Sequence, residues 1–300
     1  MKVRAVLTAL CLIMPAFVAD SSSAQAAKPV PQGQAAPIAV QPIKGGIYLV
    51  KGGSGANAAF VVGEKSVCVI DAKMTADSAK AMIAEIGKVT PKPITHIVIT
   101  HSDGDHINGL AGFPTGLTIV ASENTAREMA EAFKDERYAP LRAYLPNVRH
   151  SPGRKVTLDN GFPRIDLLHF GPAHTSGDTI LYFPGEKVAF VGDLIFVGRD
   201  PLIHSQKGGT SIGYIATLKK MLDLDVDTYL SGHADPLTKA ELKPVLAALE
   251  EKMAKVQAMV KAGNSIDDVR KAFGIEAPAA GAARRPSLVE VIYLDLTAKK

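Results

Sequence analysis

The hydrophobic positions after residue 46 fall into short runs that predict β-strands. The runs are rich in β-branched and aromatic residues, and glycine-containing turns separate them. They cover residues 47–50, 58–62 and 67–70. Three such runs in succession indicate an antiparallel meander. Residues 75–88 then place apolar side chains at helical spacing behind Thr75, a typical N-cap, and an apolar strand follows at 94–99. The change from meander to strand, helix and strand predicts a mixed sheet covered by helices.

A dense polar cluster follows that last strand directly. Two histidines and two aspartates, His101, Asp103, Asp105 and His106, occupy six consecutive positions. Burying such groups without partners costs several kcal/mol each, and a metal ion removes that cost. The cluster lies at the carboxyl end of a buried strand, where layered α/β proteins commonly bind ligands. His101 and Asp103 can point the same way from an extended segment, whereas Asp105 and His106 would begin the next short helix. We therefore expect a metal site here.

Three further polar residues stand at strand ends later in the chain. His174 lies in a turn rich in glycine and proline, Asp193 follows an apolar strand at 188–191, and His233 follows another at 229–231. One such residue would carry little information. Together with the cluster at His101, they predict that several loops converge on one rim of the sheet.

With these motifs in place, the chain resembles the metallo-β-lactamase-fold metallo-hydrolase superfamily. The family pattern is H-x-H-x-D-H, a histidine in a G-x-x-H-T turn, an aspartate in G-D and a final G-H. The matching residues, in the family's order, are His101, Asp105, His106, His174, Asp193 and His233. The resemblance implies a four-layer αβ/βα sandwich of the α/β (α+β) class, in which two mixed β-sheets are flanked by helices.

The resemblance also implies two divalent metal ions and assigns their ligands. His101, Asp103 and His174 would hold one ion, Asp105, His106 and His233 the other, and Asp193 would bridge them. Asp103 departs from the family, which usually has histidine there. A carboxylate can also bind zinc, but its harder oxygen shifts the preference toward iron or manganese. We expect two ions, zinc first, and keep open iron, manganese, or a single ion held by Asp105, His106 and His233.

Such a site predicts hydrolysis. Two metals about 3.5 to 4 Å apart can activate a water, and the resulting metal-bound hydroxide would attack a small ester, thioester, lactone or β-lactam carbonyl. By resemblance, Asp105 positions this water and Asp71 supports the metal loop, while His204 is a candidate substrate contact or supporting residue. Two alternatives stay open: a dinuclear iron redox enzyme of the same fold, suggested by Asp103, and a periplasmic metal-binding accessory factor with little turnover.

The N-terminus reads as a targeting segment. A basic start, an apolar stretch and Ala24-Gln25-Ala26 predict a Sec-type signal peptide over 1–26, cleaved near Ala26, and hence a periplasmic or secreted protein with no membrane span after cleavage. Residues 27–40, rich in alanine, proline and glutamine, predict a disordered lead. The metallo-β-lactamase-like hydrolase domain would span residues 41–262, and residues 263–300 would form a helical extension that packs on this domain. Cys68, in an apolar strand, is expected to be a buried hydrophobe.

Charge and motif content indicate which kinds of binding partner to expect. The net charge of +4 is modest, its basic residues are scattered and no nucleic-acid-binding motif occurs, so a small-molecule substrate is expected and nucleic acid is not. His96 and His169 read as structural residues and His150 as a solvated one. Segment 125–154 reads as a solvated helix and loop or as a lid over the site. The terminal segment 288–299 predicts a helix or strand, which would pack back or pair between subunits as a homodimer.

Overall fold

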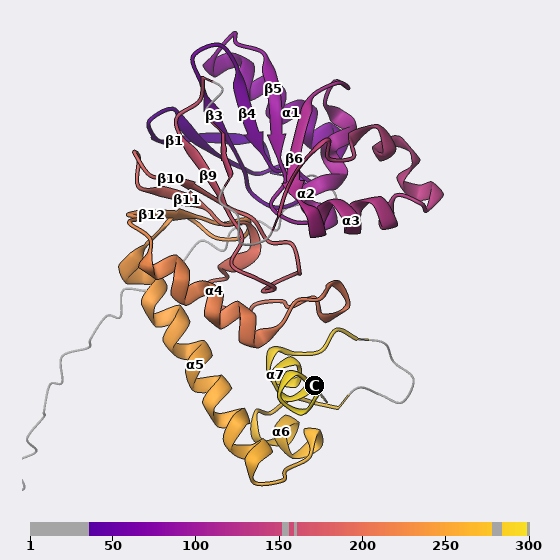
Figure 1. Cartoon of the computed structure of the whole chain (residues 1–300), viewed down its shortest axis with the longest axis vertical. Helices are drawn as coiled ribbons and strands as arrows, with labels where there is room; N and C mark the ends of the chain where they lie inside the picture. Colours follow the sequence, from indigo (N-terminus) through magenta and orange to yellow (C-terminus); the bar gives the residue numbers. More distant parts are fainter. Residues whose placement is uncertain (1–35, 152–155, 159–160, 278–283, 299–300) are drawn as a thin grey trace, which may run out of the picture. The chain divides into compact units, whose positions relative to one another are not determined.

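Two β-sheets face each other across a layer of apolar side chains in the computed structural model (Figure 1). It describes residues 36–151, 156–158, 161–277 and 284–298. The predicted signal peptide and most of the predicted lead lie outside these residues.

The first sheet has seven strands in the order of the chain. The strands are β1 (Ala39–Lys44), β2 (Ile47–Lys51), β3 (Ala58–Val62), β4 (Val67–Ile70), β5 (Ile94–Val98), β6 (Thr118–Ser122) and β7 (Val148–His150). The first four pair antiparallel and the last three are parallel, with α1 (Ala76–Val89) crossing from β4 to β5. The meander and the crossover are thus as the sequence predicts. The predicted lead, residues 27–40, overlaps β1 by two residues, because β1 begins at Ala39, which pairs with Lys51.

The second sheet has six strands in the order β13-β12-β11-β10-β9-β8. They are β8 (Val156–Leu158), β9 (Ile165–Leu168), β10 (Ile180–Phe183), β11 (Val188–Phe190), β12 (Thr228–Leu230) and β13 (Leu237–Thr238). Neighbours pair antiparallel except β11 and β12, which are parallel and are connected through α4 (Ser211–Asp223). The carboxyl ends of β11 and β12 therefore point to the same edge of this sheet.

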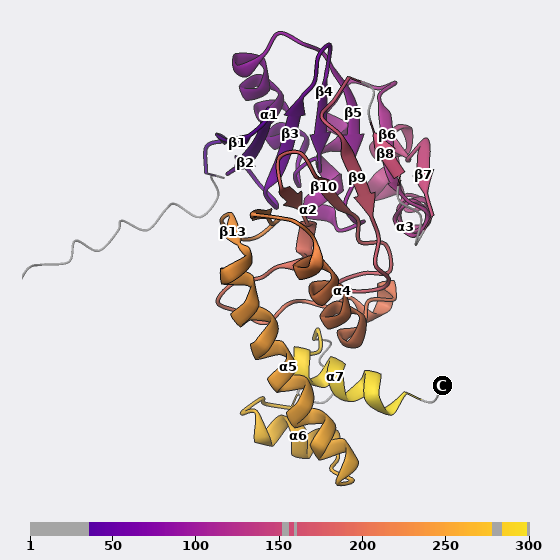
Figure 2. The same cartoon turned by 60° about the vertical axis from the view of Figure 1, so that its left-hand side comes forward.

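The two sheets and the helices outside them form four structural layers (Figure 2). Three clusters of buried apolar side chains lie between these layers. Side chains of α1 and α3 (Glu123–Ala132) pack on the outer face of the first sheet, and those of α4 and α5 (Lys239–Lys261) pack on the outer face of the second. Between the sheets lies Cys68, fully buried, and burial raises the pKa of its thiol to about 12. The four-layer αβ/βα sandwich is confirmed, and Cys68 is the buried hydrophobe expected.

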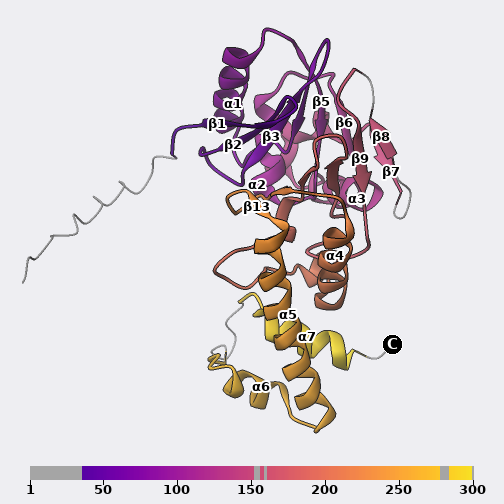
Figure 3. The same cartoon turned by 90° about the vertical axis from the view of Figure 1, so that its left-hand side faces the viewer.

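The C-terminal helices pack on α5 (Figure 3). α6 (Ile266–Ala272) begins behind Ser265 as its N-cap, and α7 (Leu288–Thr297) is a helix that lies against α5 and α4. Buried Glu290 accepts hydrogen bonds from Arg270 and Arg284, which fixes the start of α7. No helix in the described part of the chain is long and apolar enough to cross a membrane.

The described residues of segment 125–154, residues 125–151, form a largely solvated helix and loop, one of the two predicted alternatives. Its 3₁₀ helix η2 (Glu136–Tyr144) packs on η1 (Asn108–Gly112), and the buried Tyr144 hydroxyl donates to the Phe113 carbonyl at 2.7 Å. Leu141 and Tyr144 thus anchor η2 to the core, while most of its other residues are exposed. His150 was predicted to be solvated, which is wrong: it is buried, and its Nε2 lies 3.1 Å from Thr179 Oγ1. β7 pairing on β6 places this histidine inside the sandwich.

Candidate metal centre

The polar cluster occupies the turn between β5 and a one-turn helix, α2 (Gly104–Ile107). Asp103 is the N-cap residue of α2, and His106 N donates to the Asp103 carbonyl at 2.9 Å. This geometry brings the His101 and His106 rings to a centroid distance of 4.1 Å. The prediction that an extended pair and a helical pair converge from two adjacent elements is confirmed.

One group of ligand atoms combines this turn with the second sheet. Atoms of His101, Asp103, His174 and Asp193 all lie within 4.8 Å of one another. Asp103 Oδ2 is 3.2 Å from His174 Nε2 and 3.7 Å from His101 Nε2. In a tetrahedral site with bonds of about 2.0 to 2.2 Å, ligand atoms lie roughly 3.3 to 3.6 Å apart, so the spacing suits one ion.

A second group lies next to the first and shares one residue with it. Atoms of Asp105, His106, Asp193 and His233 also lie within 4.8 Å of one another. Asp193 Oδ1 is 3.1 Å from His106 Nε2, and Asp193 Oδ2 is 3.1 Å from His233 Nε2. Asp193 therefore stands between the two groups, in the position that a bridging ligand needs. All seven residues that the sequence predicted as ligands come together.

Three buried atoms of these groups make no hydrogen bond within the described residues. They are Nε2 of His101, Nε2 of His106 and Oδ1 of Asp193. A buried polar atom without a partner costs about 1 to 3 kcal/mol. A cation at each group would satisfy these lone pairs, so the residues fit two divalent ions. Their nitrogen and oxygen donors suit zinc, iron and manganese alike.

Asp71 holds the cluster from behind, as the resemblance implied. Its Oδ2 accepts from His106 Nδ1 at 2.7 Å, and its two oxygens accept from Thr100 N and Oγ1 at 2.9 and 2.8 Å. His174 is fixed in a similar way, because its Nδ1 donates to the Leu202 carbonyl at 2.7 Å. Both contacts leave Nε2 of the imidazole directed at the centre, the usual arrangement around a bound metal.

Asp103 has two further partners from the loop after Asp193. His204 Nε2 lies 2.8 Å from Asp103 Oδ2, and Lys207 Nζ lies 2.7 Å from Asp103 Oδ1. The loop that carries them, which includes η4 (Ser205–Lys207), is bound to the His174 turn by main-chain hydrogen bonds, among them His204 N to the His174 carbonyl at 2.8 Å. His204 thus contacts a candidate ligand directly. Lys207 supplies the positive charge that offsets the extra aspartate.

The charged groups shift one another strongly. Burial raises the pKa of Asp193, but the surrounding imidazoles, His106 first, hold it well below its usual value. Burial lowers the pKa of His174 and His233, but hydrogen bonds to Asp103 and Asp105 respectively raise each to about 9. An incoming cation must therefore displace protons from imidazoles at neutral pH. Metal binding is expected to strengthen as pH rises toward 9.

Two glycines allow the loops to meet. A Cβ on Gly232 would lie 2.5 Å from Asp193 Oδ1, and one on Gly192, whose φ is +55°, would lie 2.8 Å from Thr100 Oγ1. No real Cβ tolerates these distances, so both positions require glycine. The glycines in the G-D and G-H motifs are needed for close approach of the strand ends.

A cavity of about 480 Å³ lies over the two groups. Candidate ligands line its floor, and Arg199, Lys207 and Arg285 line its sides. Segment 125–151 contributes no lining residue among those described, and six residues between 196 and 207 line the cavity. Gly52–Gly55 lies in the β2–β3 loop, which is joined to the segment after β4 because Met74 N donates to the Ser54 carbonyl at 3.0 Å.

Sequence reasoning missed three basic residues of the centre. Lys73 is buried with its Nζ on the Ala56 carbonyl, and burial lowers its pKa to about 8. Lys207 and Arg285 come from a loop and from the segment before α7. Isolated lysines and arginines carry no motif, so only the fold reveals them.

Replacing Asp71 with Asn should weaken metal binding roughly 10- to 100-fold, because the carboxylate that orients His106 is lost. Asparagine tolerates the left-handed backbone of this position (φ +60°), so the fold should be retained. Competition with a chromogenic chelator measures the affinity. Asp77→Asn, on the exposed face of α1, is the matched control. Equal affinities for the two variants would contradict the role of Asp71.

Replacing Lys207 with Met should destabilise the metal-free protein by about 1 to 3 kcal/mol, because the Asp103 carboxylate loses its cationic partner. Urea unfolding of the metal-free protein measures this change. In Asp103→Asn the same lysine substitution should cost clearly less, since the two side chains are coupled. Additive effects of the two substitutions would show that the pair does not interact.

Three curated relatives have sequences similar to this chain. The alpha subunit of a 2,4-dinitroanisole O-demethylase from Nocardioides sp. is 28% identical, over 81% of this chain and 73% of its own length. A hydroxyacylglutathione hydrolase from Rhizobium meliloti is 27% identical, over 55% of this chain and 59% of its own length. A linear primary-alkylsulfatase from Pseudomonas sp. is 20% identical, over 59% of this chain and 41% of its own length.

Solved structures share the fold. A metallo-beta-lactamase from Pontibacter korlensis superposes with a TM-score of 0.60 at 18% identity, over 71% of this chain and 99% of that one. The DIM-1 metallo-beta-lactamase superposes with a TM-score of 0.61 at 17% identity, over 73% of this chain and 99% of that one. The sequence profile of the metallo-beta-lactamase superfamily matches residues 52–233, which include every candidate ligand. The chain therefore belongs to the metallo-beta-lactamase superfamily.

Proposed function

We propose that this protein is an exported metal-dependent hydrolase that cleaves a small ester, thioester, lactone or β-lactam. One observation carries the proposal: two groups of His and Asp side chains share Asp193 on the floor of a cavity open to a small molecule. The hydrolases among its relatives support the reaction class. Their names specify different substrates, so the choice among the four carbonyl classes rests on the experiment below.

The cavity favours water as the nucleophile. None of its lining residues in the described chain is serine, threonine or cysteine, and the free thiol of Cys68 is buried between the sheets. Divalent ions bound at the two groups would supply the activation of a water molecule and the polarisation of a carbonyl oxygen.

Asp105 is the residue best placed to orient the attacking water. Its side chain is 23% exposed, whereas that of Asp193 is 4% exposed, so Asp105 is the more open carboxylate on the cavity floor. His233 Nε2 lies 3.2 Å from Asp105 Oδ2, which places this carboxylate within the second ligand group. An oriented carboxylate of this kind accepts the hydrogen bond of a water and aligns it for attack.

Replacing Asp105 with Asn should lower turnover by roughly 100-fold or more, because the carboxylate that positions the water is lost. The assay uses nitrocefin, a lactone, a thioester and a carboxylic ester, each with protein reconstituted with zinc, manganese or iron. Removing metal with a chelator should abolish activity, and adding it back should restore it.

Four outcomes decide between this proposal and its competitors. A protein that binds no metal, or an Asp105→Asn variant with unchanged turnover, contradicts hydrolysis at this centre. Bound iron that undergoes redox cycling without hydrolysis would favour the dinuclear iron redox enzyme, and bound metal without turnover would favour the accessory factor. Asp77→Asn, remote from the cavity, should retain full activity in every assay.

The export in this proposal rests on the N-terminal sequence pattern. Expressed with a C-terminal tag in a Gram-negative host, the protein should accumulate in the periplasm with a new N-terminus near Ala27, as read by N-terminal sequencing. Full-length chain confined to the cytoplasm would contradict export and leave the proposed reaction untouched.

A further inference from the structure

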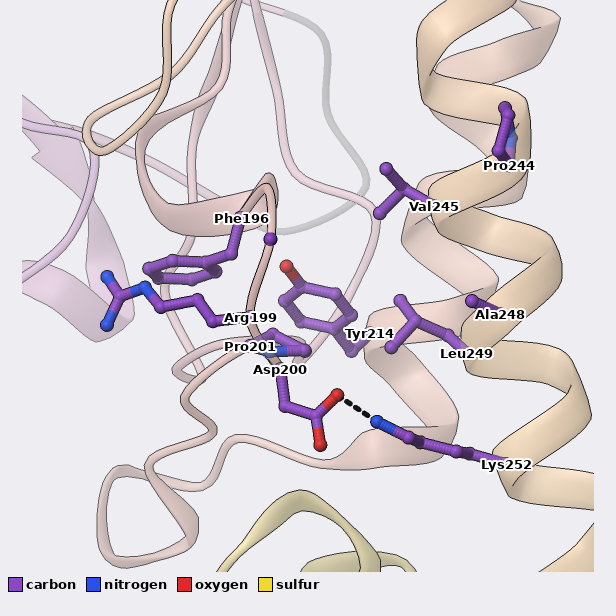
Figure 4. Close-up of a pocket in the computed structure, with 11 residues that line it drawn as sticks. Phe196, Arg199, Asp200, Pro201, Tyr214, Pro244, Val245, Ala248, Leu249 and Lys252 are labelled. Carbon is purple, nitrogen blue, oxygen red and sulfur yellow. Dashed lines mark hydrogen bonds and ion pairs between the residues drawn. The ribbon is translucent and has the colours of Figure 1, made fainter. Parts of the chain in front are cut away.

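A second cavity of about 380 Å³ lies between residues 196–201, α4 and α5 (Figure 4). Its volume is within the range of small-molecule sites. Most of its wall is apolar, contributed by Pro201, Val245, Ala248 and Leu249. This part of the wall is suited to an apolar group.

The Tyr214 side chain presents to this cavity a hydroxyl without a hydrogen-bond partner in the described chain. Tyr214 on α4 is 2% exposed, and its hydroxyl makes no hydrogen bond within the described residues. Figure 4 shows this hydroxyl directed into the space between the loop that carries Phe196 and helix α5. Burial raises the pKa of Tyr214 well above its usual value, with Asp193 and Asp178 acting in the same direction, so the phenol stays protonated. The hydroxyl can therefore donate a hydrogen bond to an acceptor on a ligand.

Two of the three charged residues that line the cavity neutralise each other. Lys252 on α5 forms an ion pair with Asp200 across the opening, as Figure 4 shows. The third, Arg199, has no ion pair within the described residues, and its guanidinium lies over the Phe196 ring, which also lines the metal centre. The ion pair also connects the loop to α5 and keeps the opening in place.

This cavity adjoins the metal centre through two shared residues. Phe196 and Arg199 line both cavities. The Phe196 ring stacks on His233 at a centroid distance of 5.5 Å and an interplanar angle of 14°, and the Arg199 guanidinium lies 4.5 Å from the Phe196 centroid. A continuous stack thus leads from a candidate metal ligand to the second cavity.

We propose that the second cavity binds the apolar arm of the substrate, an uncharged aryl or alkyl group with an oxygen acceptor that receives the Tyr214 hydroxyl. The reacting bond lies over Asp105 and the arm passes along Phe196. The inference rests on the proposed function, whose substrate it describes more closely: a polar reacting end joined to a neutral, largely apolar extension.

Binding of two matched probes to the metal-loaded protein tests the site without turnover. Acetophenone has an aryl ring and an acceptor oxygen, and in α-methylstyrene a CH₂ group replaces that oxygen. Calorimetry should show that acetophenone binds more tightly. Tyr214→Phe should reduce the ratio of the two affinities by about 3- to 10-fold, the effect of one hydrogen bond. An unchanged ratio would overturn the role of Tyr214.

Filling the cavity provides the second arm of the experiment. Ala248→Trp should abolish binding of both probes, whereas Ala247→Trp, on the same helix but outside the cavity, should leave binding as it is. Retained binding in Ala248→Trp, or no binding by the parent protein, would overturn the proposed cavity.

Competition distinguishes failure of this inference from failure of the proposed function. Acetophenone should raise KM for any hydrolysed substrate that has an aryl arm. Probe binding without any hydrolysis would contradict the hydrolase proposal and the substrate arm together while leaving a ligand cavity. Hydrolysis that acetophenone does not inhibit would overturn the substrate arm alone.

Discussion

The buried carboxylate of Asp193 is the constraint on which this edge of the molecule depends. It comes from the second sheet, yet it lies within 3.1 to 3.8 Å of four imidazole nitrogens, two of them from the turn after the first sheet. A buried charge is tolerated only among close partners of opposite or complementary character. The ligand-bearing strand ends of the two sheets must therefore lie close together. The glycines before Asp193 and His233 make this close approach possible, because a Cβ at either position would clash.

Much of this edge could be predicted from the sequence because three of its ligands, His101, Asp193 and His233, come within a few residues after an apolar strand. For such a strand, the apolar pattern predicts which side chains are buried, and its end predicts where the ligand that follows will lie. Asp71 was recognised in the same way, at the end of β4. The predicted meander and the helix that follows it were confirmed because two-residue and 3.6-residue patterns of apolar side chains show which face of a strand or helix is buried.

Residues that act from loops or at long range escaped the sequence. Lys207 reaches Asp103 only because a loop hydrogen-bonded to the His174 turn returns it to the centre, and Arg285 arrives through the packing of α7. His150 was misjudged because its neighbours in sequence, Arg149 and Pro152, are polar or turn-forming, whereas burial was decided by pairing with β6. Tertiary contacts of this kind leave no local periodic signal.

The contacts of Asp103 also determine how this centre would acquire its ions. In a centre with a mobile ligand loop, the incoming ion must order the loop, and the lost chain entropy weakens binding. Here His204 and Lys207 already hold the carboxylate, and main-chain hydrogen bonds already hold the loop. The entropy of that loop is lost during folding, before any ion arrives. Loading then becomes an exchange of protons for metal in a preformed cage, which a folded protein can complete by scavenging ions from its surroundings.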